Sequence, residues 1–299
     1  MCLEIRKKGH KNDNNLLNLS KITQMTLGID IGGTNLSLGL VHNGELKQMF
    51  STPSFSPDAT LEQTLDYLSA QIEKIITPDT GKIGIGVPTV VDVKKGIVYD
   101  AQNIPSWKEV PLKDYLENRF NVPVAVNNDA NCYAMGIYGL YPAEAKPELL
   151  VAVTLGTGVG IGIVNEGRLL CGANCGAGEL GCLHYRNSII EDYCSKKYFT
   201  VRGWDSKEAS AAARAGNPDA LALFDEMGRH LGALLCAVMY AYDPSHIAFG
   251  GGVANNHTLF GPSMMAHLRK HFPYQKAVDR LQIDYFTDNN IPVIGASLI

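Results

Sequence analysis

The sequence of 299 residues has no apolar run long enough to cross a bilayer. Its longest apolar stretches, 149–164 and 231–242, are both shorter than the ~18 residues that a membrane helix needs. An excess of positive charge is also missing, because 26 Lys and Arg face 30 Asp and Glu, and the pI is about 6.1. We therefore expect neither a membrane nor a nucleic-acid partner.

Two familiar nucleotide-binding motifs are missing as well. No G-x-x-x-x-G-K-[ST] P-loop occurs, and no G-x-G-x-x-G opens a βαβ unit. Residues 156–162 resemble the second pattern but lie between two predicted strands, not before a helix. Rossmann and P-loop folds are excluded on this context.

The seven cysteines are an odd number, and no signal peptide precedes them. This usage fits reduced thiols and a cytoplasmic protein. Residues 1–24 carry scattered Lys, Arg and Asn without apolar periodicity, which is typical of a flexible tail. A start at Met25, with the preceding residues as an artefact, is the alternative.

The remaining sequence repeats one plan twice. A strand over 26–31, a glycine corner at 32–35 and a strand over 36–41 form the first meander, and strands over 149–155 and 159–164 around residues 156–158 form the second. Each is followed by helical patterns and a further strand, with helices predicted at about 60–77, 190–199, 218–242 and 258–270. This organisation predicts a duplicated α/β fold with a cleft between two domains. We divide it into residues 25–130, residues 131–287 and a terminal segment, 288–299, that packs back on the first domain.

Three glycine-rich segments are candidates for holding a nucleotide. Asp30, Gly32, Gly33 and Thr34 combine a carboxylate at a strand end with bare backbone amides, which suits phosphate oxygens and a hydrated Mg²⁺. An ordinary hairpin turn is the alternative for this corner taken alone. The other two segments are a second corner, Gly156, Thr157 and Gly158, and a glycine pair after a strand that could lie against adenosine, Gly251 and Gly252.

Asp129 is the candidate general base. It follows a predicted strand in Asn127-Asn128-Asp129, where a carboxylate could take the proton of a hydroxyl that accepts a phosphoryl group. The same position suits an N-cap of the following helix, which is the structural alternative.

Five blocks together resemble the ROK family of sugar kinases and repressors. They are Asp-Ile-Gly-Gly-Thr-Asn at 30–35, Asn-Asn-Asp-Ala-Asn at 127–131, Leu-Gly-Thr-Gly-Val-Gly-Ile-Gly at 155–162, Gly-Ala-Gly-Glu-Leu-Gly at 176–181 and Phe-Gly-Gly-Gly-Val at 249–253. The resemblance runs from about Thr26 to the C-terminus. It implies a duplicated actin-like, ribonuclease H-like ATPase fold that uses ATP and Mg²⁺, with Asp129 as base and Asp30 holding the metal through water.

The resemblance also implies which residues contact a sugar. These are Asn103, Asn128, Asp129, Glu179 and Glu191. For Glu191, a solvated helix position is the alternative.

The sequence departs from the family at its metal-binding segment. The family's Cys-x-Cys-Gly-x-x-Gly-Cys zinc loop is missing between His184 and Glu191, and Cys182 stands where His is usual. The remaining spacings match no standard zinc pattern. We expect no structural zinc.

The predicted function is ATP-dependent phosphorylation of a hexose hydroxyl by a homodimeric enzyme. The alternatives are a sugar-sensing regulator of the same family and a nucleotide-binding protein without kinase activity. A regulator would need a helix-turn-helix domain, which residues 1–24 do not resemble. The sequence leaves open which hexose or N-acetylhexosamine is accepted.

Overall fold

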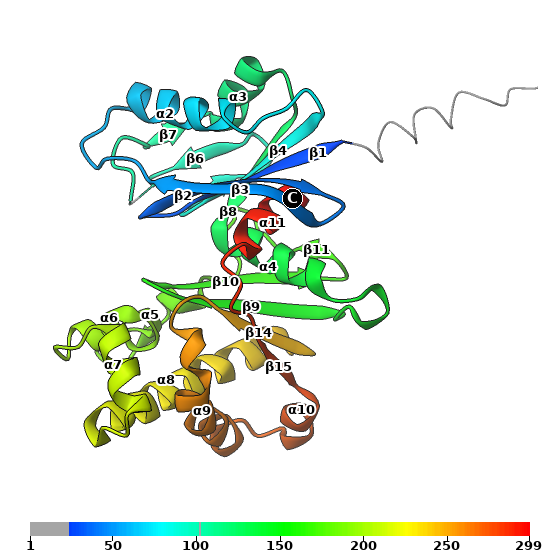
Figure 1. Ribbon diagram of the computed structural model, residues 1–299. Helices are drawn as coiled ribbons and strands as arrows, with labels where there is room; N and C mark the ends of the chain where they lie inside the picture. Colours follow the sequence, from blue (N-terminus) through cyan, green and yellow to red (C-terminus); the bar gives the residue numbers. More distant parts are fainter. Residues whose placement is uncertain (1–23, 102) are drawn as a thin grey trace, which may run out of the picture.

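The computed structural model describes residues 24–101 and 103–299, so the tail predicted at 1–24 lies, apart from Gln24, outside the described residues. Two five-stranded sheets with the same plan are stacked one above the other (Figure 1). The first has the order β3-β2-β1-β4-β8 and the second the order β11-β10-β9-β14-β15. In each, three antiparallel strands are followed by two parallel ones. The predicted duplication is therefore confirmed.

The strands of the first sheet are β1 (Met25–Ile31), β2 (Asn35–His42), β3 (Glu45–Pro53), β4 (Thr80–Val87) and β8 (Val124–Asn128). Those of the second are β9 (Leu149–Leu155), β10 (Val159–Asn165), β11 (Arg168–Leu169), β14 (His246–Gly250) and β15 (Gln282–Tyr285). Two smaller sheets are formed by β5 (Val91–Asp92), β6 (Ile97–Tyr99) and β7 (Glu109–Val110), and by β12 (His184–Tyr185) and β13 (Ser188–Ile189).

Helices cover the outer face of each sheet. In the first half these are α2 (Leu61–Glu73) and α3 (Leu112–Phe120), and in the second α5 (Ile190–Cys194), α6 (Lys196–Thr200), α7 (Ser206–Arg214), α8 (Pro218–Tyr242), α9 (His257–His271) and α10 (Gln275–Arg280). Three short 3₁₀ turns, η1 (Ala143–Ala145), η2 (Glu179–Cys182) and η3 (Ala254–Asn256), lie in the second half. Each half has its own buried core, one around Trp107 and one around Phe224.

Local signals in the sequence explain where most of these helices begin. Thr60 and Gln63 form the predicted capping box of α2, with reciprocal hydrogen bonds of 2.9 and 3.2 Å. Pro218 begins α8 after the N-cap Asn217, as predicted. The predicted end of α2 was too late, because the helix ends at Glu73. The β-branched Ile75 and Ile76 instead form a turn whose N–H groups bond to Ile72.

The helix predicted over 190–199 is interrupted at Ser195. There the backbone is extended, and the Ser195 hydroxyl caps α6 by accepting the Lys197 N–H at 3.2 Å. The interruption gives two short helices, α5 and α6, in place of one.

Two helices lie between the sheets and connect the halves. Helix α4 (Asp129–Leu140) packs on β9 and β10 of the second sheet, and α11 (Ile291–Leu298) packs on β1, β2 and β4 of the first. The two helices also contact each other. A Cβ on Gly84 would overlap the Ala296 carbonyl, so glycine is needed for this close approach. The domain division at residue 130 falls one residue inside α4, and we keep it as a proposal.

Candidate active site

The carboxyl ends of the parallel strands bring Asp30 and Asp129 together. In the first sheet Asp30 pairs with Gly86 of β4, and Gly86 pairs with Asn127 of β8. A Cβ on Gly86 would lie 3.4 Å from the Asp129 Cα, so this glycine leaves room for Asp129. Such an edge is where open α/β sheets hold their ligands.

Asp129 is the first residue of α4 and not its N-cap. The cap is Asn128, whose side-chain oxygen accepts the N–H groups of Ala130 at 2.9 Å and Asn131 at 3.4 Å. The alternative interpretation, in which Asp129 is the N-cap of the following helix, is therefore wrong. The Ala130 N–H is shared with the Asp129 carboxylate, whose Oδ1 accepts it at 2.8 Å.

Burial and like charge perturb these carboxylates. Burial, together with the charge of Asp129, raises the pKa of Asp30 to about 7. Burial also raises the pKa of Asp129 to about 6; the Ala130 N–H opposes this rise and Glu179 adds to it. Three of the predicted site residues, Asp30, Asp129 and Glu179, are therefore close enough to interact electrostatically. No cationic side chain of the described residues is among the groups that shift either aspartate pKa.

The first glycine corner is closed by a hydrogen bond from the Gly32 N–H to the Asn35 carbonyl, at 2.9 Å. The Thr34 side chain is exposed at the tip. Gly33 lies against Asn103, because a Cβ there would be 3.2 Å from the Asn103 Nδ2. The predicted sugar residue Asn103 is thus beside the predicted phosphate corner.

The second corner and the Gly251–Gly252 pair lie together at the edge of the second sheet. The Gly156 N–H bonds to the Gly158 carbonyl at 3.0 Å, and the Val253 N–H bonds to the Leu155 carbonyl at 3.0 Å. Gly251 has φ +84° and packs on the Leu155 backbone. Added Cβ atoms at Gly156 and Gly252 would meet nothing within 4 Å, so both backbones face open space. Within the described parts of the chain no backbone hydrogen bond joins this corner to the first one.

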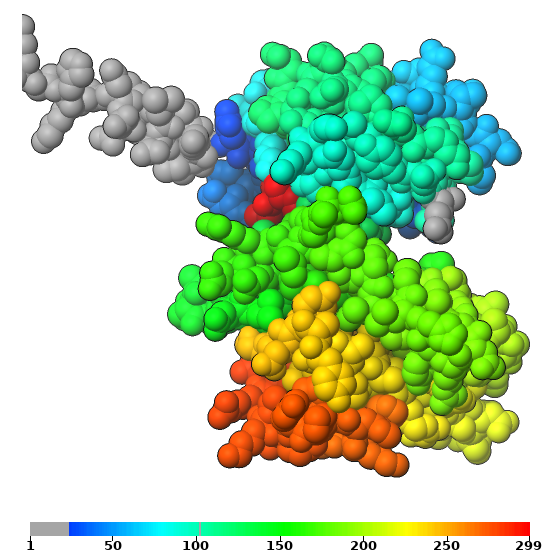
Figure 2. Space-filling model, turned by 180° about the vertical axis from the view of Figure 1, so that it is seen from behind, coloured from blue at the N-terminus to red at the C-terminus, as the bar shows by residue number. Residues whose placement is uncertain are grey.

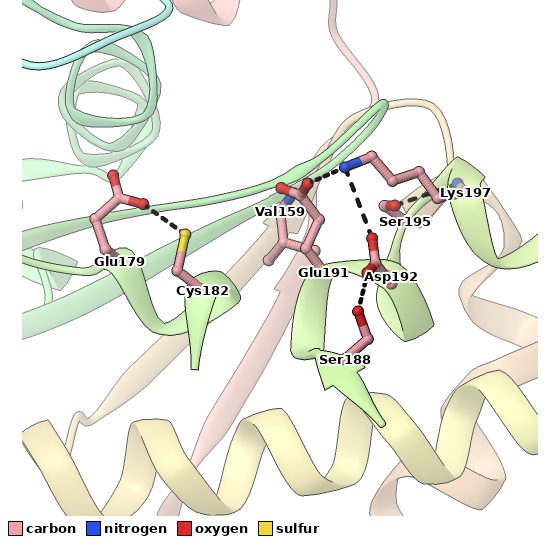
Figure 3. Close-up of polar contacts among 8 residues, drawn as sticks. All are labelled: Val159, Glu179, Cys182, Ser188, Glu191, Asp192, Ser195 and Lys197. Carbon is pink, nitrogen blue, oxygen red and sulfur yellow. Dashed lines mark hydrogen bonds and ion pairs between the residues drawn. The ribbon is translucent and has the colours of Figure 1, made fainter. Parts of the chain in front are cut away.

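Glu191 connects the second corner to a lysine that the sequence analysis did not identify. Its Oε2 accepts the Val159 N–H at 3.0 Å, and its Oε1 pairs with the Lys197 Nζ at 2.6 Å (Figure 3). The Lys197 ammonium also lies 3.7 Å from Asp192. Glu191 is therefore not a solvated helix residue, and a Cβ on Gly158 would overlap its carboxylate. A sequence signal for Lys197 was available in the basic pair 196–197 that follows Glu191.

A cavity of about 550 Å³ opens beside the second corner. It is lined by Thr157, Ser188, Asp192, Tyr193, Lys196, Lys197, Thr200, Val201 and Arg202. Its three cationic side chains outnumber the single carboxylate. The space-filling view from behind shows the two halves stacked, with a notch between them at one side (Figure 2).

Cys182 occupies the position where the family usually has His. Its thiol donates to the Glu179 Oε2 at 3.5 Å (Figure 3). Burial, with the nearby Glu179 charge, raises the pKa of Cys182. Within 24–101 and 103–299 no cluster of three or more His, Cys, Asp or Glu residues is arranged to hold a metal ion. None of the helices in these ranges is long and apolar enough to span a membrane.

Known proteins resemble this chain in sequence and in structure. The chain is 30% identical to the glucokinase of Thermotoga maritima over 79% of this chain and 84% of that protein. It is 27% identical to an N-acetyl-D-glucosamine kinase of Escherichia fergusonii over 77% and 85% of the two chains. The crystal structure of a ROK family glucokinase from Streptomyces griseus in complex with glucose and AMPPNP is 29% identical, covers 91% of this chain and 98% of its own, and has a TM-score of 0.75.

Structural neighbours of this kind carry the duplicated actin-like ATPase fold that the sequence predicted, and that prediction is confirmed. The ROK family matches residues 26–299, which is nearly the whole described chain. With the glycine corners and the buried aspartates in place, the chain belongs to the ROK family.

Proposed function

We propose that this protein is an ATP-dependent sugar kinase that transfers the γ-phosphoryl group to a hexose hydroxyl, with Asp129 as the general base. The observation that carries the proposal is the environment of Asp129. It is a buried carboxylate with a pKa of about 6 that interacts electrostatically with Asp30 and Glu179, and no cationic side chain of the described residues is among the groups that shift its pKa. A base with a pKa near the working pH is well matched to proton transfer.

Polar groups from both halves suit a sugar. Asn103 and the Asn128 amide come from the first half, while Glu179 and Glu191 come from the second. A hexose presents hydroxyls on several sides, so convergent donors and acceptors bind it with specificity. Relatives with glucokinase and N-acetyl-D-glucosamine kinase activity support a hexose or an N-acetylhexosamine as the acceptor.

The residues present also fit ATP and Mg²⁺. The open backbone at Gly156 and Gly252 leaves space for phosphates and adenosine, and Lys196 lines the cavity beside Thr157. Asp30 faces a second carboxylate without a cation, which favours a divalent metal held through water. When bound, Mg²⁺ neutralises charge on the transferred phosphoryl group.

The protein's own part in the reaction is to position the sugar and move one proton. In this proposal the Asn and Glu side chains orient the hexose so that one hydroxyl lies at the Asp129 carboxylate. Asp129 accepts the hydroxyl proton as the oxygen attacks the γ-phosphorus. Because phosphoryl transfer needs little covalent help, positioning accounts for most of the rate.

The test is a coupled ADP-release assay over a panel of hexoses and N-acetylhexosamines, with Asp129→Asn beside the natural protein. We expect one or more sugars to be phosphorylated, and the variant to lose about 10²-fold or more in kcat, since general-base help is worth 10²–10⁴. Sugar affinity measured by calorimetry should change little. Asp66→Asn, at an exposed position of α2 on the outer face of the first sheet, is the matched control.

Two results would contradict the proposal. An unchanged kcat in Asp129→Asn would remove Asp129 as the base. Sugar and ATP binding without transfer to any member of the panel would favour the sugar-sensing regulator or the nucleotide-binding protein without kinase activity.

A further inference from the structure

Two cysteines that the proposed reaction does not use lie together beneath the site. Cys171 follows β11, and Cys175 lies four residues later in the loop that leads to Glu179; both are free thiols. Their sulfurs contact the same two amide side chains, those of Asn127 and Asn131. The Asn127 Nδ2 is 3.7 Å and the Asn131 Nδ2 is 3.9 Å from the Cys171 Sγ.

Cys175 has the closer contacts with the same amides. Its thiol donates to the Asn127 Oδ1 at 3.2 Å, and its sulfur accepts from the Asn131 Nδ2 at 3.4 Å. Because the two sulfurs share the same two small amide groups, they lie near each other.

The loop backbone holds the pair in this arrangement. The Cys171 carbonyl accepts the Ala177 N–H at 3.1 Å, which closes the loop. Gly172 and Cys175 both have positive φ values, +74° and +57°, and turn the chain back on itself. A left-handed conformation is uncommon for a residue with a side chain, so this backbone conformation of Cys175 costs conformational energy.

The two thiols differ in exposure and in pKa, and thiol exchange needs one accessible, readily ionised thiol beside a second one. Cys171 is half-buried and Cys175 is buried. The neighbouring Cys175 thiol and the Asn127 amide lower the pKa of Cys171, whereas the neighbouring Cys171 and burial raise that of Cys175. The thiolate is the reactive form of cysteine, so Cys171 is the attacking group and Cys175 the resolving one.

A third thiol near the pair has no such property. Cys132 is fully buried, and burial, with the charges of Asp30, Asp129 and Cys171, raises its pKa. It is therefore a poor nucleophile.

We propose that Cys171 and Cys175 are a reversible thiol–disulfide modification site whose oxidant is a low-molecular-weight disulfide such as oxidised glutathione. The Cys171 thiolate attacks one sulfur of the oxidant, forms a mixed disulfide and releases one thiolate. The Cys175 thiol then loses its proton to solvent, attacks the Cys171 sulfur and releases the second thiolate. The protein loses two electrons and two thiol protons, and the oxidant is reduced to two thiols.

Formation of the bond would disturb the proposed active site. Asn127 would lose the thiol hydrogen that it now accepts, and the sulfurs would approach to about 2.05 Å. Asn127 and Asn131 flank Asp129 on either side, and the loop continues into Glu179. Oxidation should therefore lower the rate of sugar phosphorylation; this part rests on the proposed function.

The first experiment detects the bond without using activity. The fully reduced, full-length protein is exposed to oxidised glutathione, free thiols are alkylated, and the digest is analysed by mass spectrometry. We expect the peptide that contains both cysteines to lose two hydrogens and to regain them with dithiothreitol. Cys175→Ser should stop at the mixed disulfide on Cys171, and Cys171→Ser should leave Cys175 reduced.

The matched control is Cys236→Ala, at a position in α8 remote from the pair, which should form the bond as the natural protein does. Thermal unfolding of each variant shows that it is folded before it is oxidised. A bond from Cys132 to either partner, or a glutathione on exposed Cys182 with no bond between Cys171 and Cys175, would overturn the inference.

The second experiment measures turnover of the oxidised protein. We expect kcat to fall about 10²-fold, because a displacement of ~1 Å can cost this much, and to recover with dithiothreitol. Cys171→Ser should be insensitive to the oxidant. An unchanged kcat after complete oxidation would overturn the effect on the site. The bond forming in a protein that phosphorylates no sugar would leave the modification site standing and reject the proposed function alone.

Discussion

At the scale of single residues, the acid–base properties of Asp129 come from its position more than from its chemistry. The same aspartate on the surface would have its ordinary pKa, but burial and the Glu179 charge raise this pKa to about 6. Asn128, and not Asp129, caps α4, and the Asp129 carboxylate accepts the Ala130 N–H.

A pH profile tests this environment. A base works only when it is unprotonated, and a carboxylate whose pKa is raised to about 6 is protonated below that pH. We expect kcat/KM for the sugar to be level near pH 7 to 8 and to fall about tenfold per pH unit below about 6. The residual activity of Asp129→Asn should not show this fall in kcat/KM at low pH. A profile that stays level down to pH 4.5 would contradict the raised pKa.

The open glycine at position 252 gives a second test at this scale. In Gly252→Val the new side chain enters empty space, so we expect unchanged thermal stability. It would occupy the proposed nucleotide space, and an overpacking cost of about 1–3 kcal/mol corresponds to ATP binding about 5- to 150-fold weaker. Calorimetry with ATP and with the sugar should show that only ATP affinity falls.

Gly261→Val in α9 is the control, since a Cβ there has nothing closer than 3.7 Å. Gly158→Val is a poorer test, because its side chain would also displace Glu191. Equal ATP affinity in Gly252→Val and the natural protein would show that the nucleotide does not bind beside Gly252.

At the scale of elements, α11 depends on glycines that let it approach the first sheet. A Cβ on Gly84 would overlap the Ala296 carbonyl, and one on Gly295 would overlap the Cys132 carbonyl of α4. The Lys82 ammonium donates to the backbone oxygen of Ile299 and holds the end of the chain on β4.

We expect Gly84→Ala to lower the free energy of unfolding by about 1–3 kcal/mol or more, because the sheet and α11 must move apart. Denaturant unfolding measures the change. Gly261→Ala, at a half-buried position of α9 where a Cβ meets nothing closer than 3.7 Å, should stabilise by up to about 1 kcal/mol, because alanine favours a helix. Equal stability of Gly84→Ala and the natural protein would show that α11 packs less closely than the structure has it.

At the scale of the whole molecule, the proposed site is shared by the two halves. Asp30 and Asp129 come from the edge of the first sheet, while Thr157, Glu179, Glu191 and Gly251 come from the second half. Helices α4 and α11 lie between the sheets and contact each other, so relative motion of the halves must pass through this pair.

We expect the accepted hexose to draw the halves together and so exclude water from the phosphoryl group. Small-angle scattering should show a smaller radius of gyration with the sugar, and ATP hydrolysis without sugar should be slow. An unchanged radius with fast sugar-independent hydrolysis would favour a nucleotide-binding protein without sugar chemistry. From the sequence we place the hinge near residues 131–138 and before the C-terminal segment. Residues 131–138 lie inside α4, so we expect rotation about this helix and not bending within it. The homodimer stays a prediction.

Much of the fold was predictable from sequence, because its signals are local. Strand patterns, glycine corners, the capping box of α2 and the Asn217-Pro218 start of α8 each depend on residues a few positions apart. The repeated order of these signals predicted the duplication, and the five blocks predicted the family.

Tertiary structure decided between alternatives that local sequence patterns do not distinguish. In Asn127-Asn128-Asp129 any of the three residues can cap a helix, and the choice of Asn128 follows because β8 pairs with β4 as far as Asn128. The break at Ser195, which brings Lys197 to Glu191, and the loop that joins Cys171 and Cys175 to Asn127 and Asn131 bring together side chains from separate elements. Such contacts, and the burial that raises the pKa of Asp30 and Asp129, arise only in the folded molecule, because desolvation is a property of the whole fold and not of any segment.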